Sequence, residues 1–333
     1  MLYQQLENQR VRCRLCAHRC FIAEGKRGVC SVRENRGGRL YSLVYGKLIS
    51  LQIDPIEKKP LFHFFPGSKI FSIASPGCNF RCSFCQNWQI SQITKGPRGQ
   101  IVGENYSPQE VVQLALESGS QSIAYTYTEP TIFFEFAYDT AKLSRRKGLK
   151  NIFVSNGYQT PETIEYLAGI IDAINVDLKS FSAEYYLKYC GAKLEPILRN
   201  IKLFLQAGIW VEVTTLIVPR ENDSPSEIKA IAEFLASLSP DIPWHISRFY
   251  PHYQMQDHPA TPLETLYQAY EIAKEAGLHY VYLGNVPSPQ YTSTFCPFCQ
   301  ALVVERRFYQ VRSYLEEGGR CPRCHKKLPF RLK

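Results

Sequence analysis

Short apolar runs alternate with longer segments of helical periodicity through the middle of this 333-residue chain. The runs are rich in β-branched and aromatic residues, as strands buried on both faces of a parallel sheet usually are. We therefore predict seven strands, at 70–76, 122–127, 151–156, 173–179, 210–218, 244–250 and 279–286.

Helix start and stop signals mark two of the segments between these strands. Segment 107–119 opens with Ser107, a favourable N-cap residue, and closes with Gly119. Segment 261–277 has Pro262 inside its start and Gly277 past its end. The repeated strand–helix order implies right-handed crossovers and an α/β fold, either a barrel or an open sheet.

Conspicuous polar residues directly follow six of the predicted strands. In α/β barrels the functional groups gather where strands end and loops begin, so we expect one site at one mouth of a barrel. In strand order the residues are Cys78, Cys82 and Cys85; Thr128, Glu129 and Pro130; Ser155, Asn156 and Gly157; Asp177 and Lys179; Arg220 and Asn222; and His252.

The composition, 45% hydrophobic and 21% charged, suits one large domain with small appendages. The chain contains no apolar span of about 20 residues, and its polar start lacks the apolar core of a signal peptide. We therefore expect a cytoplasmic protein that does not enter a membrane. Twelve cysteines in that reducing compartment indicate metal sites rather than disulfides.

The net charge of +9 is concentrated at the two ends of the chain. Residues 1–40 and residues 301–333 each hold nine Lys and Arg against three acids, and the middle is slightly negative. We favour the interpretation that these cations offset the charge of metal-bound thiolates. A nucleic-acid patch is the alternative.

The stretch "GCNFRCSFCQNW" (77–88), here called the cysteine loop, offers three cysteines where a closed structural zinc site would need four ligands. His63, 15 residues upstream of Cys78, is the available fourth residue for zinc. Three thiolates can instead bind three irons of a cubane cluster and leave the fourth iron open to an exogenous chelating molecule. We favour the cluster, with Gly77 allowing close backbone approach and Phe84 shielding it from water.

Cys-x3-Cys-x2-Cys with an aromatic residue before the last cysteine resembles the motif of the radical S-adenosylmethionine (radical SAM) superfamily. The resemblance implies a partial TIM-like (β/α)6 barrel and a [4Fe–4S] cluster whose open iron chelates the methionyl amino and carboxylate groups. It also implies that one electron cleaves S-adenosylmethionine to methionine and a 5′-deoxyadenosyl radical, which abstracts a substrate hydrogen. The electron donor would be a low-potential protein of the flavodoxin or ferredoxin type.

Further stretches narrow the resemblance. "CQNW", "VSNGY", "VDLK" and "LIVPRENDS" are similar to segments of glycyl-radical activating enzymes, such as that of pyruvate formate-lyase. From Cys13 to "CPRCHKKLP", the chain resembles the radical enzyme of the AmmeMemoRadiSam system. The implied partners are proteins of that system or a glycyl-radical protein, and the substrate stays open. An RNA-modifying radical enzyme and a non-catalytic metal-binding adaptor are the alternatives.

The resemblance also implies roles for strand-end residues. Glu129 would contact the methionyl amino group, a charge-assisted contact, and Lys179 would reach the carboxylate region, with Asp177 near the ribose or a bound cation. A solvated acid and a simple salt bridge are the alternatives. The remaining cofactor-binding residues implied are Ser155, Asn156 and His252, the last lying over the adenosine.

Two further cysteine groups flank the predicted barrel (67–288). The C-terminal group lies in 289–333 as two Cys-x2-Cys pairs around a hairpin-like segment, 301–315. We favour a zinc ribbon there over an auxiliary iron–sulfur cluster. The N-terminal group lies in 1–66 and could bind zinc, with His18 able to replace one thiolate, or a second iron–sulfur cluster. The groups are Cys296, Cys299, Cys321 and Cys324; and Cys13, Cys16, Cys20 and Cys30, while Cys190 is interpreted as a small buried hydrophobe.

Overall fold

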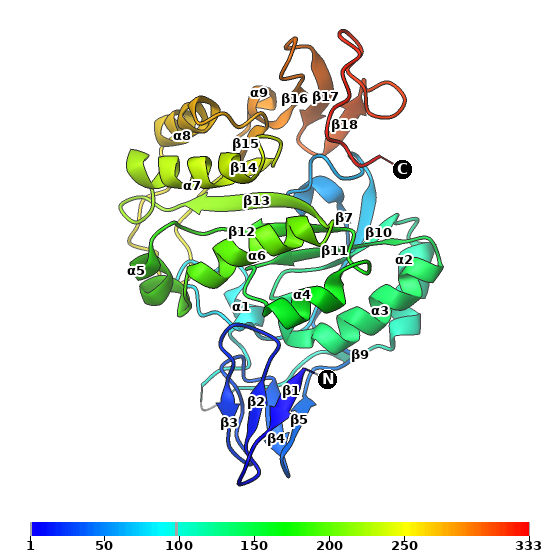
Figure 1. Cartoon of the computed structure of the whole chain (residues 1–333), viewed down its shortest axis with the longest axis vertical. Helices are drawn as coiled ribbons and strands as arrows, with labels where there is room; N and C mark the ends of the chain where they lie inside the picture. Colours follow the sequence, from blue (N-terminus) through cyan, green and yellow to red (C-terminus); the bar gives the residue numbers. More distant parts are fainter. Residues whose placement is uncertain (1, 97–98, 333) are drawn as a thin grey trace.

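The computed structural model describes residues 2–96 and 99–332, and one eight-stranded sheet forms its centre (Figure 1). Seven parallel strands lie side by side in chain order, and an antiparallel strand, β7 (Ser50–Pro55), pairs with the first of them. The parallel strands are β8 (Lys69–Ala74), β10 (Ser122–Tyr125), β11 (Lys150–Ser155), β12 (Ala173–Asp177), β13 (Trp210–Ile217), β14 (Trp244–Arg248) and β15 (Val281–Gly284). Each overlaps one of the seven predicted strands.

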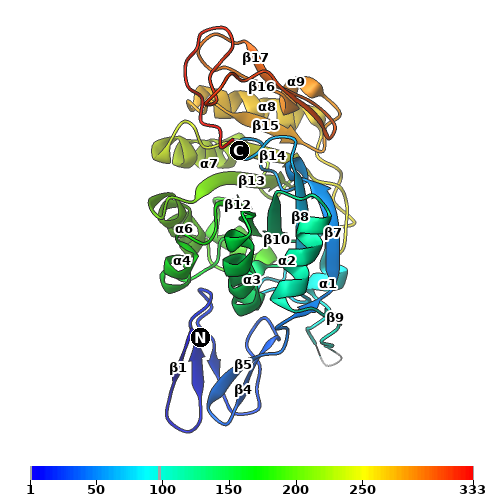
Figure 2. The ribbon, with the colours of Figure 1, turned by 90° about the vertical axis from the view of Figure 1, so that its right-hand side faces the viewer.

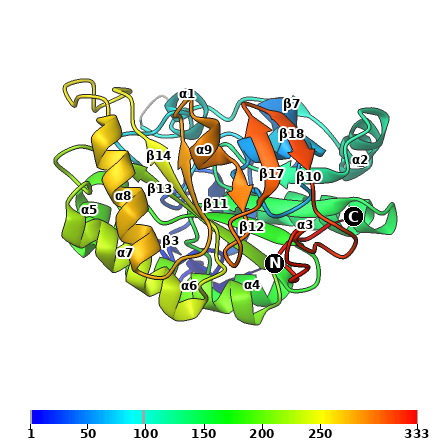
Figure 3. The same ribbon diagram turned by 90° about the horizontal axis from the view of Figure 1, so that it is seen from above.

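Six helical crossovers connect these strands, so the predicted (β/α)6 arrangement is confirmed, with a seventh parallel strand closing the series. Because every crossover joins neighbouring strands with the same hand, the helices form an arc around the outside of the curved sheet (Figure 3). The main crossover helices are α2 (Pro108–Glu117), α3 (Phe134–Arg146), α4 (Pro161–Leu167), α6 (Glu195–Gln206), α7 (Pro225–Leu238) and α8 (Leu263–Glu275).

Local sequence explains where the two predicted helices begin. In α2, the Ser107 hydroxyl accepts the Glu110 backbone N–H at 3.2 Å, and the Glu110 carboxylate accepts the Ser107 N–H at 2.7 Å, which is a capping box. Helix α8 begins at Leu263, so Pro262 is its N-cap residue and lies one position outside the predicted start.

The sheet is open because β7 and β15 are its two edges. Strand β7 was not predicted as part of the barrel, since it lies inside the segment 1–66 that we assigned to the N-terminal module. Its alternation of exposed and buried residues is weak, and pairing with β8 over six positions, Ser50↔Ala74 to Pro55↔Lys69, fixes it as a strand.

Small cysteine-bearing modules lie at opposite ends of the long axis (Figures 1 and 2). The C-terminal hairpin, strands β17 and β18, confirms the predicted hairpin and pairs with β16. No helix among the described residues is long and apolar enough to cross a membrane. The modules and connectors contain β1 (Tyr3–Gln5), β2 (Val11–Cys13), β3 (Phe21–Ile22), β4 (Arg33–Arg36), β5 (Arg39–Ser42), β6 (Lys47–Leu48), α1 (Trp88–Ser91), β9 (Glu104–Asn105), α5 (Ala183–Tyr185), α9 (Pro289–Thr292), β16 (Thr294–Phe295), β17 (Leu302–Arg307) and β18 (Gln310–Ser313).

The buried Arg306 of β17 attaches the C-terminal module to the barrel. Its guanidinium donates to the Phe62 carbonyl at 2.5 Å and to the Thr294 hydroxyl at 2.8 Å. The same group lies 4.3 Å from the centre of the Phe62 ring. Arg306 is fully buried with these partners, so it fixes the module to the rest of the protein, although the apolar core of the module is a separate cluster.

Candidate active site

A cavity of about 760 Å³ opens at the carboxyl ends of the parallel strands. Its volume falls within the range of roughly 300–1,000 Å³ that small-molecule sites occupy. The structure brings most of the predicted strand-end residues together in this one place. Those in its wall are Cys78, Cys82, Cys85, Phe84, Thr128, Ser155, Asn156, Asp177 and Lys179.

The cysteine loop follows β8 directly, and Gly77 determines how it turns. Gly77 has φ +100°, and a Cβ at this position would lie 2.9 Å from the Thr94 hydroxyl and 3.0 Å from Val32. A side chain would therefore be strained and would clash. Gly77 is thus required for packing against Thr94 and Val32, and the predicted close approach of its backbone to a cluster stays a prediction.

The three thiols of the loop fit a cluster better than a single ion. Among the described residues, no three of these sulfurs lie within 4.8 Å of one another, although all three line the cavity. A cubane places each ligand on its own metal corner, so it needs wider spacing than one shared ion. The loop thus has the donor set for a [4Fe–4S] cluster with one open iron.

Burial raises the pKa of the Cys78 and Cys85 thiols. The neighbouring Cys190 thiol, together with burial, raises the pKa of Cys82 well above its ordinary value. Metal binding would therefore release protons from these thiols. Cys190 is fully buried, as predicted, and lies beside Cys82 at the end of the π-helical turn Tyr186–Cys190.

Asparagine side chains hold the first cysteine in place. The Asn156 amide donates to Asn79 Oδ1 at 2.7 Å, and the Phe80 backbone N–H points at the Cys78 sulfur at 3.3 Å. Ser91 Oγ lies 3.3 Å from the sulfur of Cys85. N–H and O–H groups aimed at thiolates stabilise their negative charge and tune a bound cluster.

Glu129 lies behind the cavity wall, and its side chain is fully buried. Its carboxylate accepts the Thr131 backbone N–H at 3.0 Å, the Ser155 hydroxyl at 2.9 Å and the Asn156 backbone N–H at 2.9 Å. Burial raises its pKa in spite of these donors. The alternative of a solvated acid is wrong, and the geometry makes Glu129 a residue that positions Ser155 and Asn156.

Asp177 and Lys179 form an ion pair, which was the alternative interpretation, and their contacts with the cofactor stay a prediction. The Lys179 ammonium lies 2.9 Å from Asp177 Oδ2 and 5.7 Å from the centre of the Phe84 ring. Burial favours the neutral amine, but the Asp177 carboxylate and the Cys82 thiol outweigh it and raise the pKa of Lys179 well above its usual value. Lys179 therefore carries a fixed positive charge beside the cysteine loop.

Arg220, Asn222 and His252 lie outside the described cavity wall, as do Glu129, Pro130 and Gly157. Asn222 is buried and donates to the Lys179 backbone carbonyl at 2.7 Å, so it supports the loop that carries Lys179. The backbone N–H of Arg220 donates to Asp223 at 2.9 Å, in a turn where Arg220 has φ +72°. The His252 backbone carbonyl accepts the Met255 N–H at 3.0 Å. A contact of His252 with the adenosine stays a prediction.

His63 is engaged elsewhere and is not a ligand of the cysteine loop. Its Nε2 lies 2.6 Å from the Tyr282 hydroxyl and its Nδ1 lies 3.1 Å from the Pro329 carbonyl. The imidazole stacks on Phe330 at 4.2 Å. Burial lowers the pKa of His63 to about 3.

An ion-pair network that the sequence did not predict reaches the cavity wall through Lys59 and Tyr127. Lys59 is 1% exposed, with its ammonium 2.7 Å from Asp54 Oδ2 and 4.2 Å from the centre of the Tyr127 ring. Burial lowers the pKa of Lys59 to about 8, against the opposing effect of Asp54. The signal that could have found it is an acid followed by adjacent lysines in the otherwise apolar stretch "IDPIEKKPLF".

Tyr127 itself has φ +64°, a conformation that a bulky residue seldom adopts. Strain of this kind costs about 1–3 kcal/mol, and the Tyr127 hydroxyl offsets part of it by donating to Asp54 at 2.5 Å.

A buried Glu212–His245 pair at the base of the cavity was also missed. His245 Nε2 lies 2.7 Å from Glu212 Oε2, and the carboxylate also accepts the backbone N–H groups of Phe62 and His63, each at 2.9 Å. His245 lines the cavity. Charged residues inside apolar strands were the available signal, because a buried acid requires partners.

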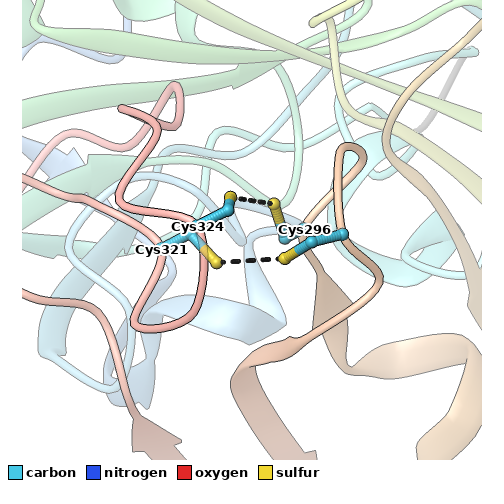
Figure 4. Close-up of side chains that lie close together, drawn as sticks. Cys296, Cys321 and Cys324 are labelled. Atoms are coloured by element: carbon cyan, nitrogen blue, oxygen red, sulfur yellow. Dashed lines mark hydrogen bonds between the residues drawn. The ribbon is translucent and has the colours of Figure 1, made fainter.

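The four C-terminal cysteines converge at one point (Figure 4). Cys296 and Cys324 place their sulfurs 3.6 Å apart, and Cys299 and Cys321 place theirs 3.5 Å apart. All four lie within 4.8 Å of one another. A tetrahedral ion with bonds of about 2.3 Å to sulfur needs this spacing, so the predicted four-thiolate site is confirmed as a geometry.

An open parallel barrel with a three-thiol loop at its carboxyl mouth defines the class of barrel enzymes that depend on an iron–sulfur cluster. The model of the Radical SAM superfamily matches residues 72–235. The uncharacterized protein MJ0808 of Methanocaldococcus jannaschii is 46% identical over 335 residues, covering 100% of this chain and 99% of its own. The chain belongs to the radical SAM superfamily.

More distant similarities have partial coverage. The benzylsuccinate synthase activating enzyme of Thauera aromatica is 28% identical over 40% of this chain and 43% of its own. The structure of SuiB from Streptococcus suis bound to S-adenosylmethionine has a TM-score of 0.53 at 14% identity, covering 73% of this chain and 56% of its own. That structure shares the fold.

Proposed function

We propose that this protein reductively cleaves S-adenosylmethionine at a [4Fe–4S] cluster held by Cys78, Cys82 and Cys85, and abstracts hydrogen from a substrate in the same cavity. The observation that carries the proposal is the convergence of these thiols with Lys179 and Asn156 on one wall. When bound, the cluster supplies the electron that divides the cofactor into methionine and a carbon-centred radical.

The side chains around the cavity have complementary tasks. Lys179 presents a positive charge to the cofactor carboxylate, while Asp177 keeps that charge fixed. Ser155 and Asn156, held by Glu129, offer polar groups to the rest of the cofactor. Phe84, which is 4% exposed, covers the cysteine loop and excludes water from it.

The substrate class that we propose is a protein partner of the glycyl-radical type, or a partner of the AmmeMemoRadiSam system. Support comes from the similarity to an activating enzyme and from the strand-end motifs "VSNGY" and "VDLK". The electron donor would be a low-potential flavodoxin or ferredoxin. We propose zinc as the ion of the C-terminal cysteine group, on the sulfur spacing described above.

The experiment is anaerobic reconstitution with iron and sulfide, followed by reduction in the presence of S-adenosylmethionine. We expect 5′-deoxyadenosine from the wild type and none from Cys78→Ala/Cys82→Ala/Cys85→Ala. Candidate partner proteins bearing deuterated glycine then report the substrate, because deuterium enters 5′-deoxyadenosine. Equal product from the wild type and the triple variant would refute the assignment of the loop.

A further inference from the structure

The N-terminal cysteine group is a compact cluster of thiols within its own small module. Cys13 ends β2, and its backbone N–H donates to the Cys20 carbonyl at 3.0 Å. The Val29 N–H points at the Cys20 sulfur at 3.5 Å, and a Cβ on Gly28 would lie at the same distance from that sulfur. The turn before Cys30 therefore wraps closely around the group.

The four sulfurs are neighbours, but they are spaced too widely for one ion. Burial raises the pKa of Cys16, and the charges of the other three thiols raise it further. Even so, no three of the four sulfurs lie within 4.8 Å of one another, whereas the C-terminal group meets that distance. Tetrahedral zinc would bring thiolates to about 3.8 Å, while a cubane spreads its four ligands over four corners.

His18 has one ring nitrogen engaged outside the cysteine group. Its Nε2 lies 2.9 Å from the Asn79 carbonyl, and its ring packs on Tyr158 at 4.9 Å. That nitrogen donates to the carbonyl, so only Nδ1 could bind a metal. The four cysteines by themselves provide a complete set of thiol donors, and His18 stays the alternative ligand.

The group lies directly against the cysteine loop. Asn79, the partner of His18, is the residue after Cys78. The Thr94 hydroxyl donates to the Cys30 carbonyl at 3.3 Å and lies 2.9 Å from where a Cβ on Gly77 would be. The two thiol groups are therefore connected by two contacts, one through His18 and Asn79 and one through Thr94.

Lys95 lies between the two groups and interacts with both. Its ammonium donates to the Phe80 carbonyl within the loop. Burial lowers its pKa, while the thiols of the loop, Cys78 and Cys82, and that of Cys30 act in the opposite direction. Lys95 therefore places one buried cation close to both thiol groups, where it would offset the charge of thiolates that bind a metal.

We propose that Cys13, Cys16, Cys20 and Cys30 bind a second [4Fe–4S] cluster that relays electrons to the cluster at the cysteine loop. A low-potential donor protein loses one electron to the outer cluster, which returns to its oxidised state as the inner cluster is reduced. The module projects from the barrel (Figure 1), and Cys16, Cys20 and Cys30 are partly exposed, so a donor can approach the outer cluster. The relay rests on the proposed function, but the cluster itself does not.

Iron and zinc counts test the cluster without any activity. We expect about eight irons per chain in the reconstituted wild type and about four in Cys78→Ala/Cys82→Ala/Cys85→Ala, since each cubane holds four. The triple variant leaves the N-terminal module untouched, so its remaining iron reports on that module alone. Mössbauer spectra should show it as a four-iron cluster.

Variants of the N-terminal and C-terminal cysteine groups show which metal each group binds. Cys16→Ser/Cys20→Ser should lose about half of the iron and keep zinc, whereas Cys321→Ser/Cys324→Ser should lose zinc and keep iron. An iron-free triple variant, or zinc lost from Cys16→Ser/Cys20→Ser, would overturn the proposal. Two clusters in a protein that does not cleave S-adenosylmethionine would support this inference and refute the proposed function.

The electron relay is tested by comparing a protein reductant, reduced flavodoxin, with a small chemical reductant, dithionite. In Cys16→Ser/Cys20→Ser, 5′-deoxyadenosine formation driven by reduced flavodoxin should fall about tenfold or more relative to formation driven by dithionite, corresponding to at least about 1.4 kcal/mol of barrier. Dithionite is small and reaches the inner cluster directly. An equal fall with both reductants would exclude the relay.

Discussion

The Glu129 carboxylate accepts the backbone N–H of Asn156 at 2.9 Å, at the point where β11 ends. Asn156 in turn donates to Asn79, the residue after Cys78. A buried acid in the loop that follows β10 is therefore joined to the cysteine loop that follows β8 through two hydrogen bonds. Any disturbance of Glu129 must reach the loop through Asn156.

Glu129→Gln should weaken both stability and cofactor binding. The amide presents N–H donors to a site where Thr131, Ser155 and Asn156 already donate, so one buried donor loses its acceptor. Such a loss costs about 1–3 kcal/mol. Urea unfolding and titration with S-adenosylmethionine measure the two effects, and exposed Glu117→Gln on α2 is the control. If Glu129→Gln had the unfolding free energy and the S-adenosylmethionine affinity of the wild type, the hydrogen bonds of Glu129 would contribute to neither.

Lys179→Met should weaken S-adenosylmethionine binding while leaving the cluster in place. The substitution keeps the stem of the side chain against Phe84 and removes the charge proposed to face the cofactor carboxylate. Contacts to charged groups contribute roughly 1.5–3 kcal/mol, so the Kd should rise about ten- to hundredfold. Lys188→Met, an exposed lysine of the neighbouring π-helical turn, should bind as the wild type does. Unchanged affinity in Lys179→Met would remove the residue from the cofactor site.

Cys321→Ser/Cys324→Ser should release one metal ion per chain and loosen the C-terminal module. Metal binding at such sites contributes about 10–16 kcal/mol of apparent free energy in small zinc modules. Metal analysis and limited proteolysis after residue 293 report the two losses. His325→Ala is the matched control, because His325 follows Cys324 but contacts Glu316 at 2.9 Å instead of the sulfurs. Metal loss in His325→Ala would show that the imidazole is a ligand.

Below about pH 6, the free energy of unfolding should decrease as the pH is lowered, because His63 is kept neutral in the folded state. The folded state keeps its imidazole neutral down to a pKa of about 3, whereas an unfolded chain protonates it near pH 6.5. The unfolded state therefore binds more protons between these values, and stability is lost as the pH falls through that window.

His63→Gln removes this titration, so the variant should lose less stability on acidification. The difference in slope is about 1.4 kcal/mol per pH unit for one proton. Urea unfolding of both proteins at pH 7, 6 and 5 measures it. Parallel slopes would mean that His63 is not kept neutral by the fold.

The barrel could be predicted from the sequence because its strands are buried on both faces. Each of the seven apolar runs became a parallel strand, and most of the polar residues predicted at the strand ends line one cavity, as Asp177 and Lys179 illustrate. The order of the strands in the sheet follows their order in the sequence, because each crossover connects a strand to the one beside it. The C-terminal thiols were equally predictable, because paired Cys-x2-Cys turns allow few other arrangements.

What escaped prediction depends on pairings between segments far apart in the sequence. Glu212 is bound by the backbone of Phe62, 150 residues away, and Asp54 meets Tyr127 only because β7 joins the sheet edge. Periodicity shows which residues are buried, but it does not show what a buried charge will meet. For the same reason, the sequence could not show whether Glu129 lines the cavity or lies buried behind its wall.

The C-terminal hairpin also contributes to the mouth of the cavity, where Phe308 and Tyr309 lie in the wall. The same module joins the barrel through Phe65, whose N–H donates to the Arg331 carbonyl at 2.8 Å. A nascent chain therefore carries its cysteine loop long before this side of the chamber exists. Synthesis has to reach the C-terminal hairpin before this part of the cavity wall exists, so a protein truncated after β15 would keep the cysteine loop but lack this part of the wall.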